Sequence, residues 1–246
     1  MNRIAVVTGG IGGLGTAICR DLARQDRHVI STYRPVNHDK ALEWQEERRK
    51  EGFDIAIYEA DVADFDSCKE MISKVEKEIG QVDILINNAG ITRDSTMKRM
   101  TQEDWEMVIN VDLTGAFNMT KQVFAGMLER QWGRIVNISS INGQKGQFGQ
   151  ANYSAAKAGL HGFTKALARE GARKGVLVNT ISPGYIATSM VMAVAEEIRN
   201  KIIEEIPVGH LGVPEDIART VAFLTDDAAG YITGANFSIN GGHHMF

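Results

Sequence analysis

The sequence predicts a single α/β domain built on a doubly wound sheet of about seven parallel strands, with helices on both faces. Short β-branched runs alternate with longer helical patterns along all 246 residues. Several of the runs, including the stretch from Val82 to Ile86, are apolar on both faces, as strands covered by helices on both sides must be. No linker, low-complexity stretch or internal repeat divides the chain, so we expect one domain over residues 1–246.

The individual elements follow from the same patterns in chain order. Strands are expected where four to eight residues rich in Val, Ile and Tyr are bounded by turn residues. Helices are expected where apolar residues recur with helical spacing. The predicted strands are 4–8, 28–33, 54–59, 83–87, 134–138, 176–181 and 236–239. The predicted helices are 13–25, 39–51, 64–79, 102–112, 113–131, 153–174, 191–205 and 214–224.

Composition excludes several classes of protein. The 27 Lys and Arg against 31 Asp and Glu give a net charge of −4, which argues against a nucleic-acid binder. The two cysteines, Cys19 and Cys68, lie in predicted helices and form no disulfide or zinc pattern, so we interpret them as buried apolar residues. No apolar run is long enough for a transmembrane helix, and no signal-peptide pattern precedes the first strand. We therefore expect a cytoplasmic protein.

A glycine-rich turn joins the first strand to the first helix. It reads Thr8-Gly9-Gly10-Ile11-Gly12-Gly13-Leu14-Gly15. Glycines there let the backbone approach a pyrophosphate, whose charge the helix N-terminus favours. The sequence therefore predicts a Rossmann-type nucleotide site with Gly9, Gly13, Leu14 and Gly15 against the cofactor; a plain turn is the alternative.

Polar residues also follow the third and fourth predicted strands. Asp61, followed by Val62, is suited to the adenine edge, although an acid there could simply cap a helix. The fourth strand ends in Asn87-Asn88-Ala89-Gly90, which either braces the central crevice of the sheet or forms a turn. We expect Asn88, Ala89 and Gly90 to contact the cofactor.

The end of the second strand indicates which cofactor binds. NAD sites usually place Asp or Glu there, against the adenosine ribose hydroxyl. This chain has no acid in Ser31-Thr32-Tyr33-Arg34, and the guanidinium of Arg34 can hold a 2′-phosphate. The sequence therefore predicts NADP(H), with a solvated loop charge as the alternative role of Arg34.

Three residues near the fifth strand predict the chemistry. Ser140 follows that strand, and Tyr153 and Lys157 lie one helical turn apart, 13 and 17 residues later. A free tyrosine has a pKa near ~10, and a neighbouring ammonium should lower it toward the working range of an acid/base catalyst. Ser140 can donate a hydrogen bond to a carbonyl oxygen as negative charge develops.

With these motifs in order, the whole chain resembles a classical short-chain dehydrogenase/reductase. The matching elements are the Thr8–Gly15 turn, Asp61, Asn87-Asn88-Ala89-Gly90, Ser140, Tyr153-x-x-x-Lys157 and Pro183-Gly184. The resemblance implies that Tyr153 is the acid/base, that Ser140 polarises the carbonyl and that Lys157 also holds the nicotinamide ribose. It places Pro183, Gly184, Ile186 and Thr188 beside the nicotinamide.

One position departs from the family pattern. The family has a fourth catalytic residue, an asparagine, where this chain has Asp112; Asn110 lies two residues early. The backbone carbonyl of that asparagine holds a water leading to the lysine. Asp112 keeps the carbonyl and the side-chain acceptor and loses the amide donor, so we expect the proton path to survive and Lys157 to be shifted by the added charge.

The substrate prediction rests on the loop 141–152 and on a closer resemblance. Three glutamines and one phenylalanine in that loop suit a short, oxygenated acyl group better than a steroid or a long chain. Stretches 87–94, 143–150 and 183–188 and the C-terminal Asn-Gly-Gly-His-His-Met resemble the branch of the family that reduces acetoacetyl-CoA to (R)-3-hydroxybutyryl-CoA for polyhydroxybutyrate synthesis. This resemblance implies that a lid at about 187–212 closes the site and that the acyl-CoA contacts Asp94, Ser140, Gln147, Phe148, Gln150, Tyr153 and Tyr185.

Two alternatives remain open. A 3-oxoacyl-[acyl-carrier-protein] reductase would share the whole apparatus, but the stretch Glu129-Arg130-Gln131-Trp132 is less basic than docking of an acidic carrier would favour, with Arg173 and Lys174 still available. A non-enzymatic NADP(H)-sensing protein is the other alternative, and the presence of Ser140, Tyr153 and Lys157 argues against it.

The resemblance also implies a homotetramer, with the apolar face of 113–128 and the segment 237–246 as candidate interfaces. We expect no metal site, because the adjacent His243 and His244 point in different directions and lack partner ligands. We interpret them as interface or surface residues.

Overall fold

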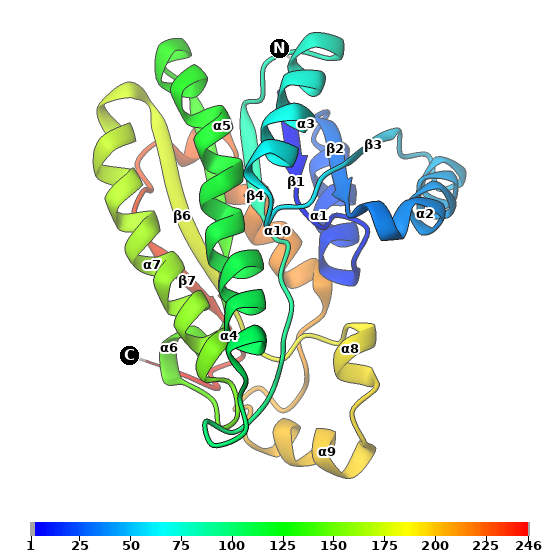
Figure 1. Cartoon of the computed structure of the whole chain (residues 1–246), viewed down its shortest axis with the longest axis vertical. Helices are drawn as coiled ribbons and strands as arrows, with labels where there is room; N and C mark the ends of the chain where they lie inside the picture. The colour runs from blue at the N-terminus through cyan, green and yellow to red at the C-terminus, as the bar shows by residue number, and fades with distance from the viewer. Residues whose placement is uncertain (1–2, 246) are drawn as a thin grey trace.

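A seven-stranded sheet forms the centre of the computed structural model, which describes residues 3–245 (Figure 1). Its order is β3-β2-β1-β4-β5-β6-β7, and every neighbouring pair is parallel. The strands are β1 (Ile4–Val7), β2 (His28–Tyr33), β3 (Ile55–Glu59), β4 (Ile84–Asn87), β5 (Gly133–Ile138), β6 (Val176–Pro183) and β7 (Asn236–Ile239). Because the order reverses between β1 and β4, a crevice opens at the C-terminal ends of these two strands. The predicted fold class is confirmed.

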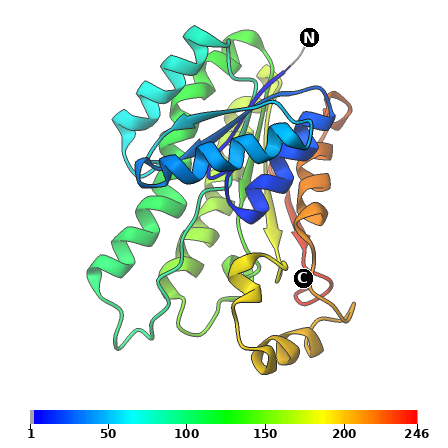
Figure 2. The ribbon, with the colours of Figure 1, turned by 90° about the vertical axis from the view of Figure 1, so that its right-hand side faces the viewer.

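Helices cover both faces of the sheet (Figure 2). One buried cluster joins the sheet to α1 (Gly13–Arg24), α2 (His38–Lys50) and α10 (Pro214–Leu224). The second joins it to α3 (Phe65–Glu78), α5 (Gly115–Arg130) and α7 (Ala151–Gly171). Ile84 and Ile86 belong to the first cluster and Leu85 to the second, so β4 is buried on both sides. This two-sided burial is the reason for the continuous apolar strand pattern.

The remaining elements are short or lie at the edge of the core. They are η1 (Pro35–Asn37), α4 (Gln102–Ile109), the π-helical turn η2 (Asn110–Thr114), α6 (Asn142–Lys145), η3 (Ala172–Lys174), α8 (Ser189–Met192), α9 (Glu196–Glu204) and η4 (Asp227–Ala229). Cys19 and Cys68 are free and fully buried, which confirms their interpretation as core residues. Within residues 3–245 there is no helix both long and apolar enough to cross a membrane.

The structure corrects three sequence-based expectations of local structure. The helix expected at 191–205 is two helices, because the chain turns extended at Ala195 before the acidic first turn of α9. Arg199 bonds the carbonyls of Met192 and Val194 across the break, at 3.3 and 3.4 Å. The expected loop at 141–152 contains α6, and α7 begins at Ala151 rather than at Tyr153.

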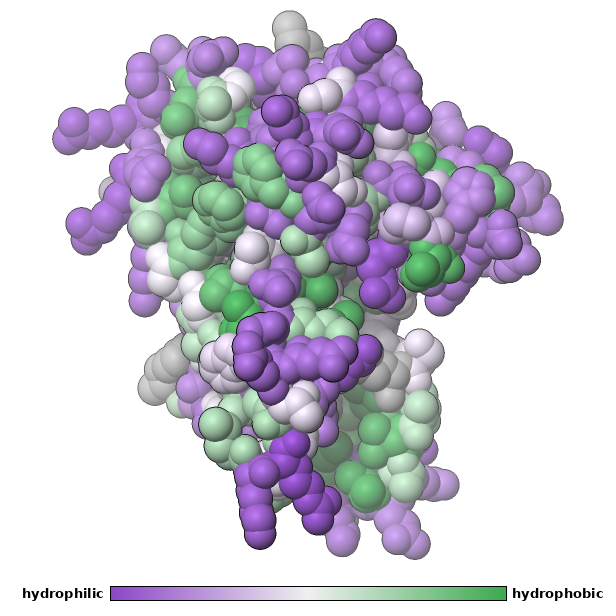
Figure 3. All heavy atoms as spheres, in the orientation of Figure 1, coloured by the Kyte–Doolittle hydropathy of each residue, from purple (hydrophilic) through white to green (hydrophobic). Residues whose placement is uncertain are grey.

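Some apolar side chains lie outside the two core clusters and are exposed on the surface. Figure 3 shows them among hydrophilic residues over α8 and α9, at the lower right of the molecule. Ile198, on α9, is 55% exposed. The segment 187–212, predicted to form a lid, therefore exposes apolar side chains among charged ones.

Candidate active site

The glycine-rich turn after β1 leaves the start of α1 open. Gly9 has φ of +62°, which favours glycine. A Cβ on Gly15 would lie 2.6 Å from both the Gly10 Cα and the Gly9 carbonyl oxygen, so a larger residue does not fit. The N-cap of α1 is Gly12, with no side-chain cap and no acid in the first turn. The free N–H groups and this close approach fit a pyrophosphate.

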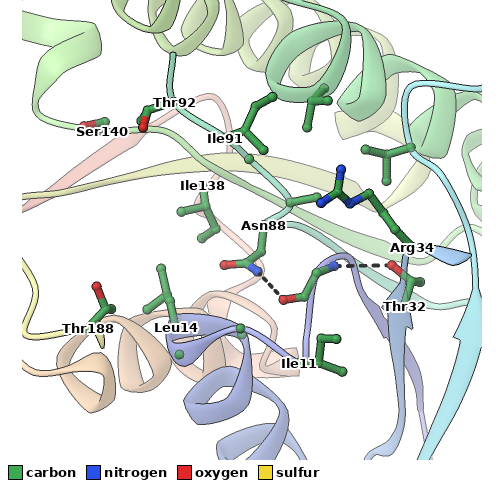
Figure 4. Close-up of a pocket in the computed structure, with 18 of the residues that line it drawn as sticks. Ile11, Leu14, Thr32, Arg34, Asn88, Ile91, Thr92, Ile138, Ser140 and Thr188 are labelled. Atoms are coloured by element: carbon green, nitrogen blue, oxygen red, sulfur yellow. Dashed lines mark hydrogen bonds between the residues drawn. The ribbon is translucent and has the colours of Figure 1, made fainter. Parts of the chain in front are cut away.

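Asn88 and Thr8 fix the crevice between β1 and β4. The backbone N–H groups of Asn88 and Ala89 each donate to Thr8 Oγ1 at 2.9 Å. The Asn88 amide donates to the carbonyls of Thr8 and Gly9, and the Gly9 N–H donates to Thr32 Oγ1 (Figure 4). The ends of β1, β2 and β4 are thereby tied together, as the bracing interpretation of the Asn-Asn pair predicted.

The neighbouring Asn87 bonds to other elements than Asn88 does. It is buried, and its amide donates to Asn137 Oδ1 at 2.8 Å and Thr120 Oγ1 at 3.1 Å. It therefore joins β4 to β5 and α5 below the crevice.

A cavity of about 490 Å³ lies over these strand ends. Every residue expected to bind the cofactor lines it, namely Gly9, Gly13, Leu14, Gly15, Arg34, Asp61, Asn88, Ala89, Gly90, Tyr153, Lys157, Pro183, Gly184, Ile186 and Thr188. Figure 4 labels Leu14, Arg34, Asn88 and Thr188 among them. Ser140 lines the cavity too. Sequence analysis missed several polar residues of the lining, among them Asn37 and Lys40, which line the cavity together with Arg34. Because Lys40 follows Arg34 by only six residues, the sequence could have predicted that it also lines the cavity.

Asp61 does not cap the following helix. Its Oδ1 accepts from the Ala63 N–H at 3.0 Å, within a turn. The N-cap of α3 is Asp64, which accepts from the Ser67 N–H at 2.9 Å. The helix-capping alternative is therefore wrong for Asp61, which lines the cavity instead.

Ser140, Tyr153 and Lys157 converge from β5 and α7. Ser140 Oγ accepts a hydrogen bond from the Asn142 N–H at 3.1 Å, so its own hydrogen stays available to a second acceptor. Lys157 Nζ donates to the Ile138 carbonyl at 3.0 Å and lies 5.5 Å from the Tyr153 ring centroid. Ser139 Oγ donates to the Lys157 carbonyl at 2.8 Å, which fixes α7 against the end of β5.

The pKa of Tyr153 departs from the sequence-based expectation. Burial raises it above the ordinary tyrosine value, against the lowering effects of Lys157 and of the hydrogen bond with Ser140. Asp112 and Asp94 raise it further. Lys157 thus lowers the pKa of Tyr153 as expected, but the net direction is upward, because the expectation omitted burial and the nearby carboxylates.

Asp112 lies beneath the cavity, in the π-helical turn η2. Its Oδ2 is 3.2 Å from Lys157 Nζ, and its Oδ1 accepts from the Ile91 N–H at 2.8 Å. The two charged side chains are 0% and 4% exposed. The added charge thus reaches Lys157 directly, as expected. Burial alone would lower the pKa of Lys157, but Asp112 and Tyr153 together raise it.

The residues expected to bind the acyl-CoA lie outside the lining of the main cavity, apart from Ser140 and Tyr153. Gln150 donates to Asp94 Oδ2 at 2.8 Å and accepts from the Asn142 amide at 2.9 Å. Gln147 is exposed and Phe148 is 87% exposed. Tyr185 lines a second cavity of about 270 Å³, which shares Ile186 with the first.

One of the two C-terminal histidines is held by neighbouring side chains. The His243 side chain is 6% exposed and stacks on Tyr185, with ring centroids 5.6 Å apart. Its Nε2 is 3.4 Å from Glu205 and 3.2 Å from Lys145 Nζ. It is therefore packed within the chain rather than at a free surface. No cluster of His, Cys, Asp and Glu within residues 3–245 could hold a metal ion. Residue 246 of the predicted interface segment lies outside the described residues.

Comparison with known proteins gives a consistent result. Residues 3–199 match the short chain dehydrogenase family. The chain is 56% identical over 245 residues to "Acetoacetyl-CoA reductase" of Allochromatium vinosum, with both chains fully covered. It is 57% identical to "Acetoacetyl-CoA reductase" of Cupriavidus necator, covering 99% of this chain and 98% of the relative. It is 42% identical, with full coverage of both, to a 3-oxoacyl-[acyl-carrier-protein] reductase of Staphylococcus epidermidis.

Proposed function

Because the chain belongs to the short chain dehydrogenase family, we propose that it is the NADPH-dependent enzyme that reduces acetoacetyl-CoA to (R)-3-hydroxybutyryl-CoA for polyhydroxybutyrate synthesis. The observation that carries this proposal is the convergence of Ser140, Tyr153 and Lys157 on a cavity whose other end is a phosphate cradle. Full-length relatives at 56% and 57% identity that bear the acetoacetyl-CoA reductase name support the substrate.

Each catalytic residue has a role that its contacts support. NADPH, when bound, supplies the hydride. Tyr153 gives its phenolic proton to the 3-oxo oxygen, and Ser140 donates a hydrogen bond to that oxygen as charge develops. The bond that Ser140 accepts from Asn142 orients the hydroxyl for donation. Lys157, held by Ile138 and Asp112, keeps a positive charge beneath the tyrosine and would hold the nicotinamide ribose.

The preference for NADPH rests on the end of β2. Arg34 and Lys40 are exposed and line one end of the cavity, where no acidic residue follows the strand. Two cations favour a 2′-phosphate, whereas an acid would repel it. Asp61, Asn88, Ala89 and Gly90 would contact the adenosine and central parts of the cofactor, and Pro183, Gly184, Ile186 and Thr188 the nicotinamide.

The carrier is proposed to be coenzyme A rather than a carrier protein. Docking of an acidic carrier needs free cations, and Arg130 is engaged: it donates to Gln81 Oε1 and to the Val82 carbonyl, both at 2.6 Å. Its guanidinium is also 3.7 Å from Asp83. The acyl-CoA path would pass Asp94, Gln147, Phe148, Gln150 and Tyr185 beneath a lid formed by 187–212.

Assembly and location complete the proposal: a cytoplasmic homotetramer. Phe65 on α3 and Phe117 on α5 are 41% and 47% exposed, and their ring centroids are 6.4 Å apart. Such an exposed aromatic pair beside the long α5 helix supports an interface with another copy. Light scattering coupled to size exclusion should give four times the chain mass of 27.0 kDa.

The deciding experiment compares NADPH oxidation with acetoacetyl-CoA, acetoacetyl-carrier protein and a longer 3-oxoacyl-CoA. We expect the highest kcat/KM with acetoacetyl-CoA, and (R)-3-hydroxybutyryl-CoA on chiral analysis of the product. Preference for the carrier protein would favour a 3-oxoacyl-[acyl-carrier-protein] reductase instead, with the same catalytic residues. Absence of turnover with every thioester would favour a cofactor-sensing protein.

A further inference from the structure

A complete buried ion pair lies directly under the catalytic tyrosine. Asp112 Oδ2 and Lys157 Nζ are 3.2 Å apart, and neither side chain has more than 4% of its surface exposed. Removing either charge from water at such a site is costly unless the partner remains in place. The two side chains therefore depend on each other.

Two separate segments of the chain build the position of the carboxylate. The π-helical turn Asn110–Thr114 carries Asp112, and the Ile91 N–H after β4 donates to its Oδ1 at 2.8 Å. Gly90 provides the space for this pair, because a Cβ there would lie 2.8 Å from Asp112 Oδ2 and 3.2 Å from Lys157 Nζ. The absence of a side chain at Gly90 thus makes room both for the Asp112–Lys157 pair and for the cofactor cavity that Gly90 lines.

The contacts of Asp112 Oδ2 indicate that this side chain acts on Lys157 through its negative charge. This atom is buried and has no hydrogen-bond partner apart from the ionic contact with Lys157. Oδ1 already holds the Ile91 N–H, a bond that an amide side chain could keep. What the carboxylate adds to the site is therefore its negative charge on the ammonium.

We propose that Asp112 is a positioning residue that holds the Lys157 ammonium in this ion pair and so limits how strongly that cation acts on the Tyr153 hydroxyl. The proposal rests on the reductase function proposed above and adds a determinant of the pH range in which the enzyme works. In the reduction, the proton leaves the Tyr153 oxygen for the substrate oxygen while hydride reaches the carbonyl carbon. The tyrosinate must then recover a proton from solvent before the next turnover.

The groups around Tyr153 shift its pKa in opposite directions. Lys157 on the same helix and the hydrogen bond with Ser140 lower the pKa of Tyr153, and burial raises it. Asp112 from the π-helical turn and Asp94 from the segment after β4 also raise it. With Lys157 still protonated, removing the charge of Asp112 should therefore lower the pKa of Tyr153, and the enzyme would lose its proton donor at a lower pH.

The test is the pH profile of Asp112→Asn, which keeps the acceptor for the Ile91 N–H and removes the charge. We expect the high-pH limb of kcat/KM for acetoacetyl-CoA reduction to move down by about one pH unit. Glu103→Gln is the control: Glu103 is an exposed acid in the first turn of α4 that lines neither cavity, so its charge is screened and the limb should move much less.

A second measurement needs no substrate. The ultraviolet difference spectrum of tyrosinate, recorded with NADPH bound and with Tyr153→Phe as the blank, reports the same proton directly. We expect the titration to move down with the kinetic limb in Asp112→Asn. Should the wild-type protein fail to reduce acetoacetyl-CoA, the proposed function fails, but this titration still tests the role of Asp112.

The proposal is overturned if Asp112→Asn binds NADPH as the wild type does and both the limb and the titration stay in place. It is also overturned if Glu103→Gln moves them equally, because the effect would then be a general one of surface charge. If the amide variant does not fold, Asp112→Ser carries the same expectation, since it also removes the charge.

Discussion

Replacing Gly143 by alanine should disturb the catalytic centre without replacing any catalytic residue. A Cβ at this position in α6 would lie 2.8 Å from the Lys157 carbonyl carbon and 2.9 Å from the Ala158 nitrogen. Ordinary carbon contacts need about 3.5 Å, so α6 has to move about 0.7 Å away from α7. Both atoms are backbone atoms of a long helix and cannot rotate away. The displacement therefore falls on α6.

The shift should be transmitted to Ser140. The Asn142 N–H, one residue before Gly143, donates to Ser140 Oγ, and Ser139 Oγ is bonded to the Lys157 carbonyl. A misplacement approaching 1 Å at a reacting group costs up to about 100-fold in rate, so we expect kcat to fall about 10- to 100-fold. Overpacking should destabilise the fold by about 1–3 kcal/mol. At about 2–4 °C per kcal/mol for a chain of this size, Tm should fall by several degrees.

The assay is kcat with saturating NADPH and acetoacetyl-CoA, together with Tm by differential scanning fluorimetry. Gly230→Ala is the matched control: its Cβ would meet only the Asp227 carbonyl oxygen, at an ordinary 3.5 Å, far along the chain from the catalytic residues. We expect the control to keep the wild-type rate and Tm. A wild-type kcat in Gly143→Ala would refute the reasoning, because the contact between α6 and α7 would then not position the serine.

Three further changes test other parts of the site. Tyr153→Phe should nearly abolish turnover while NADPH fluorescence titration shows unchanged binding; retained turnover would contradict the proton-donor role. Arg34→Ala should lower kcat/KM for NADPH about 10- to 100-fold, the equivalent of about 1.5–3 kcal/mol for a charged hydrogen bond, and leave the value for NADH nearly unchanged. Equal losses with both cofactors would argue against a phosphate contact. Lys157→Met should destabilise the protein by about 3–5 kcal/mol at neutral pH, because Asp112 is left buried and unpaired. Burial raises the pKa of Asp112 above its ordinary value, so this penalty is present above the folded pKa and should fade as pH decreases through it in urea unfolding. A loss of stability independent of pH would rule out the unpaired carboxylate as its cause.

The parts of the fold that sequence analysis predicted correctly are those with a strong local pattern. The strands are apolar on both faces, and this burial is visible in the sequence of β4 as directly as in the structure. The residues of the cofactor cavity were also predictable, because parallel strands bring Gly9, Arg34, Asp61 and Asn88 to the same edge of one sheet.

The features that were missed depend on contacts between segments distant in the chain. The break between α8 and α9 falls in a run of good helix formers, with an arginine one turn into α9 bonding the carbonyls across it. The pKa direction of Tyr153 depends on burial and on Asp112, which lies 41 residues away in the sequence. The engagement of Gln150 by both Asp94 and Asn142 has no local signal either.

The five-residue turn at Asn110–Thr114 lies between α4 and α5. A π-helical turn contains one residue more than regular α-helical winding would use, and such turns are frequent at functional sites. Deleting one residue there would let α4 and α5 merge into a regular helix, and both flanking helices would keep nearly their present phase. The fully buried Val108 would therefore stay in the core, but the widened turn that places the carboxylate of Asp112 against Lys157 would be lost. A chain shortened by one residue at this point should keep most of its packing and lose the ion pair under the tyrosine.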